Sequence, residues 1–72
     1  MITLKHAFTL CGIDDNQIVF LRRRGQTRHS ASIMTGGAVR NKLDMKAIKV
    51  TGIDIRCSYG SIDGFEFEVI GL

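Results

Sequence analysis

Residues 53–70 carry the pattern that most limits what this chain can fold into, a regular alternation of apolar and polar side chains. The apolar positions are Ile53, Ile55, Cys57 and Tyr59, followed after a break by Phe65, Phe67 and Val69. A period of two is typical of a β-strand with one buried face, and the intervening segment GSIDG is typical of a turn. We therefore predict an antiparallel hairpin over residues 53–70.

The alternation begins before the hairpin, at Ile48 and Val50, but its parity shifts at Gly52. A glycine at which a strand changes parity indicates a β-bulge or a bend, because glycine tolerates the distorted backbone. We expect this distortion at Gly52, just before the hairpin.

The N-terminal segment, residues 2–10, supports two interpretations. The positions that alternate as in a strand are Ile2, Leu4, Phe8 and Leu10. Those that form a helical stripe are Leu4, Ala7, Phe8 and Cys11. Thr3 is suited to capping a helix and Gly12 to ending one, whereas the Thr and Phe content and the period of two slightly favour a strand.

Residues 13–25 contain the clearest local helix pattern. Asp14 as N-cap and Gln17 three positions later form a capping box. Arginines in the last turn, followed by Gly25, suit the helix dipole and a glycine C-cap. We predict a helix from about Asp15 to Arg24. The alternative is a strand over residues 17–22, because the apolar run IVFL is too short for periodicity to decide.

The middle of the chain divides at Gly37. Residues 25–37 are rich in Gly, Ser and Thr and are predicted to form an exposed basic loop or an irregular strand. The next apolar positions fit a short amphipathic helix with Arg and Lys facing outward, which ends either at Val50 or before Ile48. These positions are Val39, Leu43, Ala47 and Val50.

These elements predict a small single α+β domain over residues 1–72. One or two short helices pack on an antiparallel sheet that includes the C-terminal β-hairpin. The composition, 44% hydrophobic and 24% charged, is that of an ordinary globular protein and excludes disordered and fibrous chains. Because a core of this size is marginal, we expect self-association into a homodimer to help complete it.

Positive charge is concentrated in the centre of the chain. The net charge is +3, made up of −1 in residues 1–21, +7 in residues 22–50 and −3 in residues 51–72. A segment this basic attracts polyanions, and phosphate contacts from Arg and Lys dominate nucleic-acid affinity. The predicted DNA- or RNA-binding residues are Arg22, Arg23, Arg24, Arg28, Arg40 and Lys42. The alternative is a solvated surface neutralised by the acidic C-terminal hairpin.

A short stretch, AFTLCGIDDNQIVFLRRRG, resembles a helix-turn-helix over residues 7–25, with a glycine between two helix-compatible segments. The resemblance implies that Asn16, Gln17 and the following arginines meet bases and phosphates. Phe8 departs from the motif, because it occupies a position where a small residue normally lets the helices approach.

No set of residues has the spacing of an active site or a metal site. The candidate ligands His6, Cys11, His29 and Cys57 form no close pair, and no phosphate-binding glycine motif is present. Asp14 and Asp15 are interpreted as helix-capping groups, and Cys57 as a buried structural cysteine. We therefore expect no catalytic residue, metal or cofactor, and a protein that is not an enzyme.

The two cysteines, Cys11 and Cys57, are expected to be reduced thiols, and no segment has the length of a membrane span or the order of a signal peptide. A cytoplasmic protein with no membrane partner is therefore expected. The main hypothesis is a small non-enzymatic nucleic-acid-binding or regulatory protein. The alternative is a protein-interaction module, an inhibitor or adaptor, that uses the hairpin edge or the basic loop.

Overall fold

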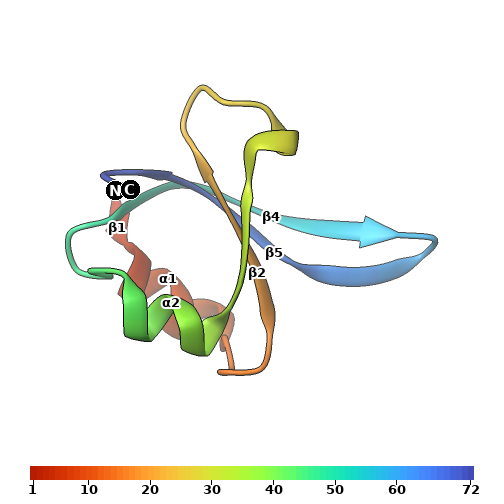
Figure 1. The fold of residues 1–72 in the computed structure, drawn as a ribbon, viewed down its shortest axis with the longest axis horizontal. Coiled ribbons are helices and arrows are strands. Elements are labelled where there is room, and N and C mark those ends of the chain that lie inside the picture. Colours follow the sequence, from red (N-terminus) through yellow and green to blue (C-terminus); the bar gives the residue numbers. More distant parts are fainter.

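A computed structural model describes all 72 residues and contains five strands, two α-helices and one short 3₁₀-helix. In chain order they are β1 (Ile2–Thr3), α1 (Leu4–Cys11), β2 (Ile18–Arg23), η1 (Arg28–Ser30), β3 (Ser32–Thr35), α2 (Gly36–Lys42), β4 (Lys49–Ser58) and β5 (Ser61–Ile70). The strands form one sheet in the order β1-β4-β5-β2-β3, and both helices lie on the same face of it (Figure 1). The α+β fold class is confirmed.

The sheet is mixed, because β2 and β5 are parallel whereas the other neighbours are antiparallel. Strands β4 and β5 form the predicted C-terminal hairpin. The register of this hairpin shifts between Val50 and Gly52, which confirms the bulge expected at this glycine. A second shift follows Arg56, close to the turn.

The N-terminal segment is a helix preceded by a strand of two residues. Thr3 caps α1, because its hydroxyl accepts a hydrogen bond from the His6 N–H at 3.1 Å. Gly12 ends the helix in the left-handed conformation, at φ 63°. The helical stripe Leu4, Ala7 and Phe8 is fully buried, so the slight preference for a strand over residues 2–10 was wrong beyond Thr3.

The predicted helix over residues 15–24 is wrong, and the alternative strand is observed as β2. The Gln17 N–H does donate to the Asp14 carbonyl, at 3.2 Å, but this bond closes only a single turn. Strand β2 lies between β3 and β5, where Val19 and Leu21 are buried beneath the helices and Phe20 on the opposite face. Burial on both faces outweighs the local capping pattern. Without this helix there is no helix-turn-helix.

Helix α2 is shorter and begins earlier than predicted. Thr35 caps it through a hydrogen bond from the Ala38 N–H, and Leu43 ends it in an extended conformation. The chain then turns around Asp44, so the predicted continuation of the helix toward Val50 is wrong. Within residues 25–37, the irregular-strand alternative is correct for β3, which precedes α2 directly.

The core lies between the helices and the sheet. Its members are Leu4, Ala7, Phe8, Ile13, Val19, Leu21, Val39, Ile48, Val50, Phe67 and Val69. The hairpin contributes its Phe67 and Val69 end to this core, as predicted. Ile53 and Ile55 were also expected to pack on the helices, but they are 45% and 46% exposed, because the outer half of the hairpin extends beyond both helices (Figure 1).

Candidate functional site

One cluster of charged side chains lies on the face of the sheet opposite the helices, centred on the buried carboxylate of Glu66. This side chain is 5% exposed and pairs with Arg56 at 2.6 Å, with Arg22 at 3.5 Å and with Arg28 at 4.0 Å. Arg56 also stacks on the Phe20 ring, at 4.3 Å from its centroid. Three arginines therefore share one acid, and two of them, Arg22 and Arg56, are largely buried.

The neighbouring acid, Glu68, extends this cluster. Its carboxylate accepts hydrogen bonds from the Thr51 hydroxyl at 2.7 Å and from Arg22 at 2.9 Å. These two bonds, with the nearby charges of Arg22 and Arg24, hold the pKa of Glu68 below its ordinary value of 4.5. Arg22 and Arg56 also donate to carbonyl groups of the β2–β3 loop, at Gln26 and Arg28. The cluster thus fixes that loop against the sheet.

Arg40, on α2, makes a separate set of contacts. Its guanidinium pairs with Asp15 at 2.5 Å, donates to the Ile13 carbonyl and lies 5.3 Å from the centroid of the Phe8 ring. These contacts tie α2 to the loop between α1 and β2. The role of Arg40 in this structure is to hold that loop in place.

The six residues predicted to bind nucleic acid are therefore divided. Arg22 and Arg28 pair with Glu66 of the C-terminal hairpin, as the neutralised-surface alternative anticipated, whereas Arg40 pairs with Asp15 outside the hairpin. Arg23, Arg24 and Lys42 form no ion pair. The sequence does not indicate which of these residues are paired, because Glu66 lies far along the chain from Arg22 and Arg28.

The cations without an ion pair stand in segments that meet at one end of the sheet, where β2 and β5 finish and β4 begins, beside the α2–β4 turn and the start of α1. We call this group the basic end; its members are Lys5, Arg23, Arg24, Lys42, Lys46 and Lys49. The Arg24 N–H donates to the Val69 carbonyl, and Lys49 pairs with Ile70 in the next strand. Asp44 is the only acidic side chain in the turn between α2 and β4, and its carboxylate accepts backbone N–H groups of that turn.

Lys5 and Lys46 reach the same end through the turn after α2, because the Lys5 N–H donates to the Met45 carbonyl at 3.2 Å. Three members of the basic end, Lys5, Lys46 and Lys49, were missing from the predicted set. The sequence offered a signal for two of them, since Lys46 and Lys49 lie in the basic segment 22–50. No pattern in the sequence indicates that Lys5 lies at the basic end.

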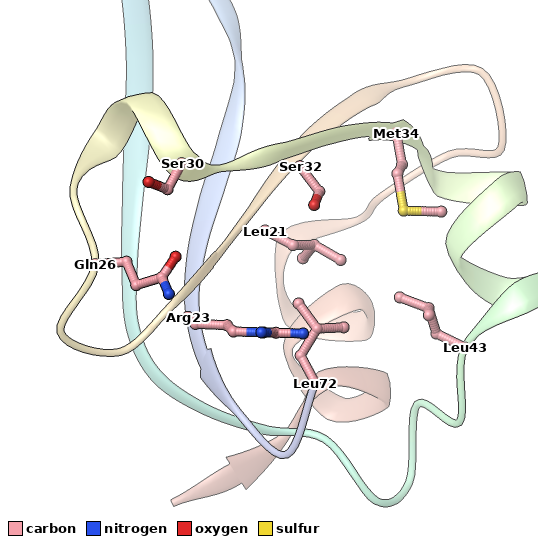
Figure 2. Close-up of a pocket in the computed structure, with 8 residues that line it drawn as sticks. All are labelled: Leu21, Arg23, Gln26, Ser30, Ser32, Met34, Leu43 and Leu72. Atoms are coloured by element: carbon pink, nitrogen blue, oxygen red, sulfur yellow. The ribbon is translucent and has the colours of Figure 1, made fainter.

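A groove of about 550 Å³ opens beside the basic end on the helix-covered side (Figure 2). The lining residues are Leu21, Arg23, Gln26, Ser30, Ser32, Met34, Leu43 and Leu72. Leu21, Met34, Leu43 and Leu72 lie toward one side, Ser30 and Gln26 lie on the other, and the Arg23 side chain extends between them (Figure 2). Such a surface can hold the edge of a phosphate-bearing chain with a base or sugar against the apolar side.

The remaining reactive groups do not form a site. No group of three or more His, Cys, Asp or Glu side chains lies close enough to hold a metal ion. Both cysteines are free, and the expected burial of Cys57 is wrong, because its side chain is exposed in the outer half of the hairpin. Burial raises the pKa of the Cys11 thiol, which makes it less nucleophilic at neutral pH. No helix has the length and apolar character needed to cross a membrane.

Comparison of this chain with protein-family models, curated proteins and solved structures finds no match.

Proposed function

We propose that this chain is a small cytoplasmic, non-enzymatic nucleic-acid-binding protein with a regulatory role, which contacts phosphates through the basic end. The single observation that carries the proposal is the segregation of its cations. Four of the ten Lys and Arg residues are held in internal ion pairs, and the other six stand in the segments that meet where β2 and β5 finish and β4 begins.

Unpaired cations retain the field and the hydrogen-bond donors that a phosphate needs. A guanidinium already paired with a carboxylate would have to exchange that partner, whereas Lys46 and Lys49 make no ion pair that must first be broken. The strands and the α2–β4 turn fix the backbone of the basic end, so little ordering is needed on binding. The nearby groove adds Ser30, Ser32 and Gln26 as neutral partners for sugar or phosphate oxygens.

The test is the salt dependence of binding to duplex DNA, single-stranded DNA and duplex RNA, measured by fluorescence anisotropy. Each phosphate neutralised contributes about −0.9 to the slope of log K against log salt for duplex DNA. The triple variant Arg24→Gln, Lys46→Gln, Lys49→Gln should therefore bind more weakly, with a slope shallower by about 3. Comparison of the three probes identifies the type of nucleic acid.

A matched control removes charge elsewhere. Arg28→Gln takes away an exposed guanidinium that faces Glu66, so it should change the slope by much less than one phosphate contact. Absence of binding to all three probes at low salt would refute the proposal. Equal losses from Arg28→Gln and from a single basic-end variant would show that net charge, and not this arrangement, determines the affinity.

A second candidate function, a protein-interaction module, draws on a different feature. The outer half of the β4–β5 hairpin carries exposed apolar side chains, Ile53, Ile55 and Ile62, and unpaired strand edges. Exposed edges of this kind add strands from partner proteins. A pull-down that recovers one protein at fixed stoichiometry, unaffected by nuclease and lost on Ile55→Pro, would favour this function.

A further inference from the structure

The outer edge of β4 lacks a neighbouring strand over most of its length. Strand β1 pairs with β4 only at Lys49 and Val50, so the backbone from Gly52 to Ser58 has no partner on this side. The backbone N–H of Ile55 points outward from this edge, because it donates to the Asp54 carboxylate at 2.8 Å and not to β5. The backbone groups of Ile53 and Cys57 share that outward direction through the two-residue period.

The side chains along this edge are sorted by face. Ile53 and Ile55 lie on the face that carries Phe65 and Phe67, as their register with β5 requires. Asp54 and Arg56 lie on the opposite face, where Arg56 meets Glu66. The edge therefore has an apolar side and a charged side, and neither is covered by the helices (Figure 1).

We infer that the partner of this edge is a second copy of the chain, joined by antiparallel β4–β4 pairing around a twofold axis at Ile55. This inference builds on the second candidate function and names its partner. A twofold axis at Ile55 pairs Gly52 with Ser58 of the other copy, so the whole free edge is used. Partner residues beyond Ser58 would meet the N-terminal residues next to β1, which limits the ladder to this length.

Charge selects this register over its neighbours. An axis at Ile55 places each Asp54 opposite the Arg56 of the other copy, on the same face, in a pair whose side chains lie close together. An axis at Asp54 would oppose two carboxylates, and an axis at Arg56 two guanidinium groups. Both alternatives are disfavoured by like-charge repulsion.

Pairing would also give the outward backbone groups of the β4 edge a partner. The Ile55 N–H would exchange the Asp54 carboxylate for a carbonyl of the second copy. Asp54 would then lie opposite Arg56 of the other copy, whose guanidinium keeps its contacts with Glu66, Phe20 and the Arg28 carbonyl of its own chain. The apolar sides of the two hairpins would form one continuous surface, and the two basic ends would point away from each other.

The test uses disulfide cross-linking in the full chain with Cys11→Ser and Cys57→Ser. Ile55→Cys would place two introduced thiols across the axis with Cα atoms about 5.5 Å apart, within the range of about 4.4–6.8 Å for a disulfide. Ile62→Cys is the matched control, because Ile62 is exposed but lies in β5, away from the axis. We expect a covalent dimer from the first variant under mild oxidation, and none from the second.

Sedimentation equilibrium of the unmodified chain and two further variants completes the test. Ile55→Pro removes only the outward N–H, so it should fold as a monomer, and Asp54→Ala should dimerise about tenfold more weakly. A monomeric wild-type chain, equal cross-linking at positions 55 and 62, or stronger association of Asp54→Ala would overturn the inference. A monomeric wild-type chain would not decide whether the hairpin binds a different protein, which the nuclease-treated pull-down tests separately.

Discussion

Replacing Glu66 by glutamine should destabilise the fold more than any other single loss of an ion pair in this chain. Glu66→Gln keeps the size of the side chain but removes the charge shared by Arg22, Arg28 and Arg56. Arg56 would then be a largely buried cation without its counter-charge, and Arg22 would keep only its pair with Glu68 at 2.9 Å. Arg28 is 64% exposed and would be solvated.

The magnitude follows from this difference in burial. Removing one partner of a buried ion pair costs about 3–5 kcal/mol, because an uncompensated charge remains. The side chains of Arg22 and Arg56 keep 18% and 20% exposure, which places the expected loss near the lower limit, about 3 kcal/mol. In a domain of this size each kcal/mol lowers Tm by about 4–8 °C, so the expected decrease is about 12–24 °C.

The assay is thermal and urea unfolding followed by circular dichroism, with Asp15→Asn as the comparison. Asp15 is also a carboxylate paired with an arginine, but it is 75% exposed, and exposed pairs contribute less than about 1 kcal/mol. A loss below about 1 kcal/mol for Glu66→Gln, or equal losses for the two variants, would refute the argument that Glu66 organises this face.

Three smaller predictions concern other parts of the fold. Because the folded pKa of Glu68 is depressed, its contribution to stability should be present above pH 4.5 and be lost as the pH falls through the lower folded value; Glu68→Gln should flatten that part of the stability profile. Gly64→Ala should cost about 1–3 kcal/mol in urea unfolding, since its Cβ would lie 2.3 Å from the Ile18 carbonyl oxygen of β2, and an unchanged midpoint would contradict that contact. Thr3→Ala should cost about 1 kcal/mol, whereas Thr3→Ser should cost much less, because the serine hydroxyl can still cap α1.

The sequence predicted the fold class and the hairpin because both depend on patterns local to a few residues. The alternation in residues 53–70 needs no information from the rest of the chain, and the Gly52 bulge follows from the same pattern. The capping box at Asp14 was equally local, yet it misled, because the position of β2 between two strands depends on residues distant in the chain. Central strands such as β2 are recognisable only when both neighbours are known.

The candidate site was predicted in part for a related reason. The sequence identified the basic segment but not which of its arginines are neutralised, since Arg22 and Glu66 meet only through the parallel pairing of β2 with β5. Lys5 could not be anticipated either, because it is brought to the basic end by a hydrogen bond to the turn after α2. The sequence shows how many charged residues this segment contains, whereas the order of the strands is needed to know which of them form ion pairs.

The most direct test of the central claim is an NMR titration of the ¹⁵N-labelled chain with a short duplex DNA and a short single-stranded RNA at low salt. The proposed function predicts that amide shifts change with whichever nucleic acid binds, chiefly at Lys5, Arg24, Lys46 and Lys49. The amides of Arg56 and Ile62 should change little. Changes centred on the Glu66 cluster or the hairpin, or no change with either probe, would contradict the assignment of binding to the basic end.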